Sequence, residues 1–253
     1  TRALGGAACN CALDLARLSP ETRVRPLAAL GRDLRDAGVF LVREQPGLLR
    51  VLALIALINL FLSALFLVGL PYLIKITLGL SSQLYSFAEA ALSLGSILGG
   101  MLSGAALRRT GLRGAWRFLL GTALSLLPIT LALVLGLPPL AAYGVILAAV
   151  LAGMACAMLF TVAAQTYLQR ATPPHLLGKV AAFVSAISTC AMPLGQALYG
   201  VLFEAFQARA WVVVLLGLAA SLAVALASVP ALRKLPGLDE APSGGYTEES
   251  LNP

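Results

Sequence analysis

Six apolar runs, each long enough or nearly long enough to cross a lipid bilayer, follow one another along most of the chain. They cover residues 51–74, 84–107, 116–136, 140–165, 179–203 and 210–229. An apolar helix needs about 20 residues to span the hydrocarbon core of a membrane. Because a helix satisfies its backbone hydrogen bonds internally, the six runs predict an all-α membrane protein with six transmembrane helices.

The charged residues support this assignment by their number and by their position. They make up only 11% of the 253 residues, against about 25% in soluble domains. A net charge of +7 would suit nucleic-acid binding, but the positions of the basic residues argue for a membrane instead. Of the 18 Lys and Arg, all but Lys75 and Arg209 lie on the side of the runs where both chain termini are expected. Basic residues mark the cytoplasmic side of a membrane. We therefore predict a multi-pass protein of the cell membrane, with cytoplasmic termini and no nucleic-acid partner.

The segments around the apolar runs differ in composition and predict four regions. Residues 1–19 are small and apolar and suggest the remnant of a preceding transmembrane helix, so the chain is expected to be a fragment. Residues 20–47 form a charged linker with an amphipathic helix, which either lies in the membrane interface or is a cytosolic linker helix. Residues 48–230 are the six-span domain. Residues 231–253 are rich in Pro, Gly, Ser and Glu, which predicts a disordered cytoplasmic tail.

Motifs for common catalytic chemistries are missing from the sequence. With one His and four Cys the chain has too few ligands for a zinc site. It contains no GxxxxGK[ST] phosphate loop, no HExxH and no GxSxG. We therefore expect no metal, no cofactor and no enzymatic activity.

Glu89 is the one acidic residue that lies inside an apolar run and away from its ends. A carboxylate costs roughly 2.5–3.5 kcal/mol at the centre of a membrane helix, and less toward its end. Ser93, Ser96 and Ser103 follow on the same helix face, so this face is expected to meet protein or a wet cavity. Glu89 is then a candidate for proton coupling or substrate contact. The alternative is a carboxylate that reaches the outer headgroups and has no function.

Two further polar features lie in the apolar runs. Asn59 is placed near the midplane by the helix rise. The fifth run carries a polar stripe on one helix face, which includes the candidate site residues Thr189 and Gln196. Such groups either join helices by hydrogen bonds or line a cavity. The stripe consists of Ser185, Ser188, Thr189, Met192, Gln196 and Tyr199.

Small residues concentrate in the second run. Gly95 with Gly99, and Gly100 with Gly104, form two small-xxx-small pairs. Small residues let the backbones of two membrane helices approach closely, so this run is expected to pack tightly on another helix.

Several loops resemble those of one transporter family. Residues 165–180 resemble the loop between the tenth and eleventh spans of major facilitator superfamily exporters. The second run and its loop resemble the G-x-x-x-D-R-x-G-R-R motif of the same superfamily, although Arg108 stands at the Asp position. Residues 33–50 resemble the segment before the seventh span in the macrolide- and siderophore-efflux branch. The matching positions are Gly104, Arg109, Gly111 and Arg113 in the first loop and Thr166, Gln169, Pro173, Gly178, Lys179 and Val180 in the second.

This resemblance implies the C-terminal six-span half of a twelve-span exporter, with an inverted three-plus-three repeat. It implies export of small amphipathic molecules by alternating access, driven by proton antiport. The partners would be the lipid bilayer, a small-molecule substrate, protons and a missing N-terminal half. The glycine and polar stripes of the second and fifth runs would pack on that half. Two alternatives stay open: a six-span half-transporter or channel that forms homodimers, and a membrane scaffold subunit without transport.

Overall fold

The computed structural model of the chain describes residues 46–172 and 174–233. All regular elements in these two segments are helical, and six helical spans are long and apolar enough to cross a membrane. The predicted fold class, an all-α membrane protein with six transmembrane helices, is confirmed. The predictions for residues 1–19, for most of 20–47, for most of 231–253 and for Pro173 lie outside the described residues.

Some of the six spans are single helices and others are divided. The first contains two π-helical segments, η1 and η2, and the third is interrupted at Ser125. The elements are α3 (Pro46–Ile58), η1 (Asn59–Ser63), α4 (Ala64–Pro71) and η2 (Tyr72–Thr77) in the first span, α5 (Ser82–Thr110) in the second, α6 (Trp116–Leu124) and α7 (Leu126–Val134) in the third, α8 (Pro139–Ala171) in the fourth, α9 (Pro174–Ala205) in the fifth and α10 (Ala210–Arg233) in the sixth, with 3-10 turns η3 (Leu112–Gly114) and η4 (Gln207–Arg209) before the third and sixth.

Local sequence signals explain where the longest helices begin and end. The Ser81 hydroxyl accepts a hydrogen bond from the backbone N–H of Leu84 and caps the start of α5. At the other end of α5, Gly111 has a φ of 63° and its N–H donates to the Leu107 carbonyl at 2.8 Å. This left-handed conformation suits glycine, so α5 ends there. Pro139 occupies the first position of α8, where its missing N–H costs nothing.

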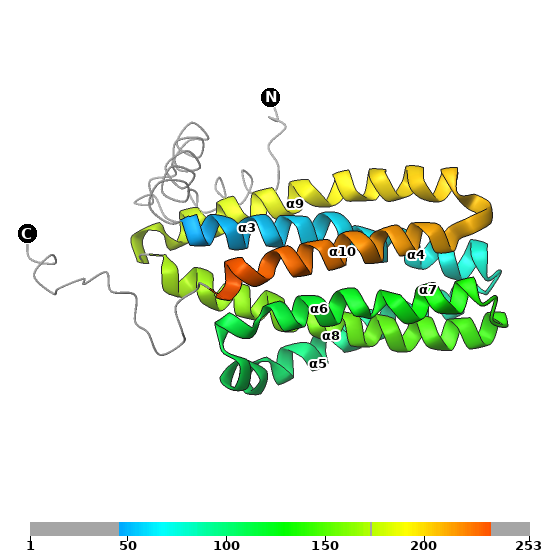
Figure 1. Cartoon of the computed structure of the whole chain (residues 1–253), viewed down its shortest axis with the longest axis horizontal. Coiled ribbons are helices and arrows are strands. Elements are labelled where there is room, and N and C mark those ends of the chain that lie inside the picture. The colour runs from blue at the N-terminus through cyan, green and yellow to red at the C-terminus, as the bar shows by residue number, and fades with distance from the viewer. Residues whose placement is uncertain (1–45, 173, 234–253) are drawn as a thin grey trace, which may run out of the picture.

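The packing of the six spans repeats after three. The second span packs along the fourth, through α5 and α8. In the same way the fifth span packs along the first, through α9 with η1 and α4. The third span packs on the fourth, and the sixth packs on the first. If the first, second and third spans are matched with the fourth, fifth and sixth, each of these helix–helix contacts in one half has its equivalent in the other. Each span lies three crossings away from its equivalent, so the two run in opposite directions. This arrangement is the inverted three-plus-three repeat (Figure 1).

The core has two clusters of buried apolar residues, one toward each end of the bundle. One end holds the start of α3, the end of α10 and the loop with Arg108, Arg109 and Arg113, and we call it the basic end (Figure 1). There the guanidinium groups of Arg117 and Arg233 each lie 5.7 Å from the Trp116 ring. Arg233 thus links the end of α10 to the start of α6.

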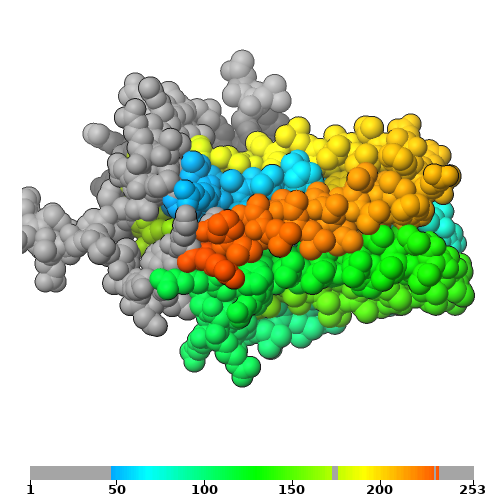
Figure 2. All heavy atoms as spheres, viewed as in Figure 1, coloured from blue at the N-terminus to red at the C-terminus, as the bar shows by residue number. Residues whose placement is uncertain are grey.

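Helices α6, α7 and α10 pack together on one face of the bundle (Figure 2). The helices α5 and α9, which we call the arm helices, each leave one long apolar side exposed. These sides include Leu94, Ile97, Leu98, Met101 and Leu102 on α5 and Leu194, Leu198 and Val201 on α9.

Candidate functional site

A groove lies between the first span and the helices α5, α8 and α9. It consists of two adjoining cavities of about 280 and 150 Å³. Ser63, Phe66, Ser96 and Met154 line both cavities, so the two adjoin each other. The larger cavity extends to Glu89 on α5 and Met192 on α9, and the smaller one extends to Gln165 on α8. Four helical spans, the first, second, fourth and fifth, therefore contribute to one groove.

Glu89 lies in the larger cavity, at the end of the bundle opposite the basic end. The Tyr85 hydroxyl donates a hydrogen bond to Glu89 Oε1 at 2.5 Å. Lys75 Nζ lies 4.6 Å from the centroid of the Tyr85 ring. The Tyr85 side chain therefore stands between an ammonium group and a carboxylate. Glu89 and Tyr85 both line the cavity, whereas Lys75 is not among its lining residues.

Asn59 lies in the smaller cavity, where the first span changes from α-helix to π-helix. Its Nδ2 donates to the Ile55 carbonyl at 3.0 Å, one turn earlier in the same span. Asn59 lines the cavity, and its side-chain oxygen is a hydrogen-bond acceptor. A π-helical segment holds one extra residue per turn and often occurs at functional sites. Here it places both Asn59 and Ser63 on the groove.

Serine hydroxyls continue the polar side of the groove along α5. Ser93 Oγ donates to the Glu89 carbonyl at 3.2 Å, and Ser96 Oγ donates to the Leu92 carbonyl at 3.0 Å. With their protons used inside the helix, both oxygens present lone pairs to the groove. Glu89, Ser93 and Ser96 thus line the same cavity, whereas Ser103, which was expected on the same helix face, lines neither cavity.

The structure brings Glu89, Asn59 and Ser93 to one groove but leaves Gln196 and Thr189 outside its lining. Thr189 is exposed and Gln196 is half-buried on α9. Met192, from the same stripe, reaches the larger cavity instead. Tyr85 was not predicted from the sequence, although its position one turn before Glu89 on the same helix face was an available signal.

Metal chemistry has no recognisable ligand set here. Across residues 46–172 and 174–233, no group of three His, Cys, Asp or Glu side chains could hold a metal ion. The Major Facilitator Superfamily model matches residues 25–247, which is most of the chain. The chain belongs to the major facilitator superfamily. No curated protein and no solved structure matches it. Membership identifies a membrane-embedded transporter of small molecules.

The loop that resembles the superfamily motif forms around Gly111. Its left-handed backbone turns the chain from α5 into η3, and this accounts for the glycine at that position. Gly104, Arg109 and Gly178 are exposed, and Arg113 and Lys179 each interact with another group. Pro173 lies outside the described residues.

The glycine stripe of α5 serves two different sides of the helix. A Cβ on Gly95 would collide with the Leu151 carbonyl oxygen of α8, and one on Gly99 would lie 2.9 Å from Ala155 Cα. A Cβ on Gly100 or Gly104 would meet nothing within 4 Å. The expectation that the glycine stripe of this superfamily member packs on a missing half is therefore wrong for Gly95 and Gly99, which pack within the chain.

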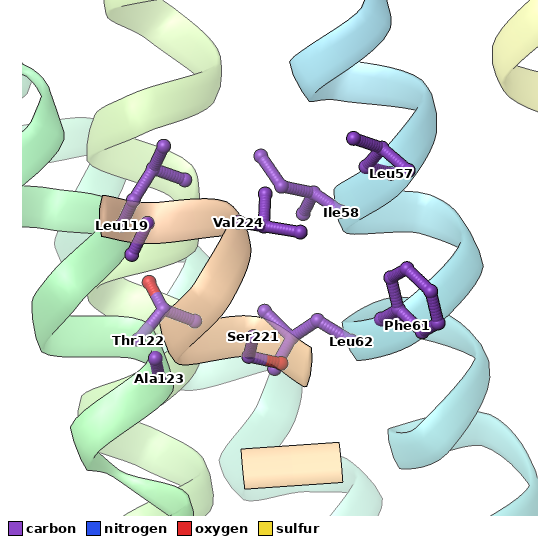
Figure 3. A pocket seen from close by; sticks show the side chains of 10 residues that line it. Leu57, Ile58, Phe61, Leu62, Leu119, Thr122, Ala123, Ser221 and Val224 are labelled. Carbon is purple, nitrogen blue, oxygen red and sulfur yellow. The ribbon is translucent and has the colours of Figure 1, made fainter. Parts of the chain in front are cut away.

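A third, water-sized cavity adjoins the groove. It measures about 20 Å³ and lies between the first, third and sixth spans (Figure 3). Apolar side chains dominate its lining, together with Thr122 and Ser221 (Figure 3). The Ser221 hydroxyl is buried without a hydrogen-bond partner in the described part of the chain. Ile58 and Leu62 line both this space and the smaller cavity of the groove, so the two are neighbours on opposite sides of the first span's side chains.

Proposed function

We propose that this chain is the C-terminal half of a secondary active transporter that exports small amphipathic molecules, in a branch similar to macrolide and siderophore exporters. The observation that carries the proposal is the groove. Asn59, Ser93 and Glu89 lie on it together with apolar side chains such as Phe66 and Leu92. A lining with both polar and apolar parts suits a substrate that has both.

The arm helices support a missing N-terminal half as the partner. They flank the groove, and their exposed apolar sides offer surface for a second six-span bundle. In transporters built from two such halves, the substrate binds between the halves near the bilayer midplane, and rocking exposes it to each side in turn. Thr189 and Gln196, which lie outside the groove lining, would then contact the partner or the substrate from α9. We place the protein in the cell membrane with both termini in the cytoplasm, because the basic residues gather at one end.

Glu89 is the proposed proton-coupling residue. Its carboxylate is the one acidic group on the groove among the described residues, and the Tyr85 hydroxyl holds it in place. Protonation from the outer side and release toward the cytoplasm would supply energy for export as the two halves rock.

Efflux measured with the full transporter tests this role. Glu89→Gln keeps the size and hydrogen-bonding reach of the side chain but does not titrate, so we expect it to abolish proton-driven efflux at near-normal expression. Glu204→Gln is the matched control, because Glu204 is exposed on α9 and does not line the groove. Parental efflux by Glu89→Gln would remove the proton-coupling role and leave Glu89 as a surface residue.

A homodimer of this chain is the second candidate, because the exposed sides of the arm helices would also suit a second copy. Reconstituting the chain alone separates the two. We expect no proton-driven flux without an N-terminal half. Robust flux from the chain alone would instead support the homodimer, and absence of flux even with that half present would support a scaffold role.

A further inference from the structure

The groove carries a single charge. Among the side chains that line its two cavities, Glu89 alone is charged, and the others are hydroxyl, amide, thioether, aromatic or aliphatic groups. One carboxylate without a cation in the lining gives the groove a negative potential. The Glu89 side chain is exposed, so its carboxylate is open to a ligand that enters the groove.

A neighbouring cation, Lys75, is engaged by an aromatic ring. Lys75 lies over the Tyr85 ring, 4.6 Å from its centroid. The polar partner of the Glu89 carboxylate among the described residues is the neutral Tyr85 hydroxyl, which donates to Oε1. The carboxylate therefore has no ion-pair partner within residues 46–172 and 174–233, and its second oxygen stays free for a ligand.

The rest of the larger cavity suits the body of an organic cation. Phe66 and Tyr85 supply aromatic rings, and Met154 and Met192 supply polarisable thioethers. The Lys75 ammonium already lies over the Tyr85 ring, which is the geometry of a cation–π contact. Aliphatic side chains complete the wall and would cover apolar groups of a ligand.

We infer that the groove selects lipophilic organic cations, whose charged nitrogen or phosphorus centre lies beside Glu89 while the apolar body lies against Phe66 and Met154. The inference rests on the proposed function, because it names the substrate class of the same groove. It excludes organic anions of the same size and shape, for which Glu89 is repulsive.

Tetraphenylphosphonium and tetraphenylborate test this selection, since they share a shape and carry opposite charges. Their binding is measured by equilibrium dialysis against the chain in a neutral detergent, with protein-free micelles as the blank. We expect saturable binding of the cation and none of the anion. Equal binding of both ions would overturn the inference.

Variants locate the site. Glu89→Gln should weaken cation binding about tenfold, the factor that corresponds to loss of one modest charge interaction. Glu204→Gln should leave it unchanged. Lys75→Gln should tighten it, because the Tyr85 ring then becomes available. A thermal unfolding midpoint close to that of the parent shows that each variant is folded. Unchanged cation binding in folded Glu89→Gln, or weaker binding in Lys75→Gln, would contradict the assignment.

Binding and transport can fail separately. Glu89-dependent cation binding without any flux, even with the N-terminal half present, would support the site and refute the transporter. Flux of neutral amphipathic compounds that is insensitive to Glu89→Gln, with no preference for the cation, would support the transporter and refute this substrate class.

Discussion

The two arm helices occupy equivalent places in the two three-span repeats, yet the protein holds them to different degrees. In the most apolar stretch of the second span, which is α5, 28% of the residues are buried, against 11% in the fifth span, which is α9. α5 packs on α8, a continuous helix of 33 residues. α9 packs on the first span, which is divided by two π-helical segments. One repeat thus has a long regular seam, whereas the other has a short seam on an irregular helix.

The glycines at the two seams show the same contrast. α5 brings two glycines, Gly95 and Gly99, against backbone atoms of α8. α9 brings only Gly195, which faces the Leu60 carbonyl inside η1. A π-helical segment displaces carbonyl groups from their regular positions. Gly195 therefore meets the least regular part of the first span, and we infer that the position of α9 depends on this one contact more than that of α5 depends on either of its glycines.

The largest expected effect comes from Gly195→Ala. The new Cβ would collide with the Leu60 carbonyl oxygen and lie 2.6 Å from Ala64 Cβ, so either η1 or α9 must move. We expect the free energy of unfolding to fall by about 3 kcal/mol, at the upper end of overpacking costs. Unfolding in mixed micelles measures it.

Gly200→Ala is the control on the same helix, because its Cβ would meet nothing within 4 Å. It should be neutral or slightly stabilising, as alanine is the better helix former. If Gly195→Ala were as stable as Gly200→Ala, α9 would not be seated on η1 as the structure has it.

A smaller loss is expected from Gly99→Ala on the regular seam. Its Cβ would collide with the Ala155 carbonyl oxygen and lie 2.9 Å from Met158 Cβ. The remaining contacts along α8 restrain α5, so we expect a loss of about 2 kcal/mol. Gly100→Ala, next in sequence and facing open space, is its control. Equal losses for Gly99→Ala and Gly195→Ala would show that the two seams are equally dependent on their glycines.

The same contrast explains what could be predicted from the sequence. The six spans follow from apolar length alone, and Glu89 stands out because a carboxylate in such a run is costly. The π-helical segment at Asn59 has no comparable signal, because it changes hydrogen-bond partners without requiring a special residue. η2 directly follows Pro71, which lacks an N–H, and this proline is a partial sequence signal for the change in helix type.

The partners of each helix were the part that sequence could not give. Gly95, Gly99, Gly100 and Gly104 look alike in sequence, yet two face α8 and two face open space. Small residues show that a close approach is possible but not which helix makes it. The groove likewise depends on tertiary packing, which is why Tyr85 and Met154 were missed while Ser93, on the face of Glu89, was found.

The smallest expected effects concern two tyrosine contacts that fix the arm helices at the end opposite the basic end. There Tyr143 donates to the Leu84 carbonyl of α5 at 2.9 Å, and Tyr72 donates to the Phe203 carbonyl of α9 at 3.2 Å. Tyr72 also stacks on Phe203, with ring centroids 4.5 Å apart. Removing a hydroxyl should cost about 1 kcal/mol at Tyr143 and less at Tyr72, because the ring stacking survives in Tyr72→Phe.

Hydrogen exchange read by mass spectrometry resolves these local losses. In Tyr143→Phe, amides in the first turns of α5 should exchange faster, while those at the end of α9 stay as in the parent. In Tyr72→Phe, the last turns of α9 should change only slightly, since the aromatic pair still holds them to the first span. Suppose that Tyr72→Phe speeds exchange at the end of α9 more than Tyr143→Phe speeds it at the start of α5. The hydrogen bond of Tyr72, and not the stacked rings, would then fix α9 at this end. That result would reverse the order expected for the two arm helices at this end.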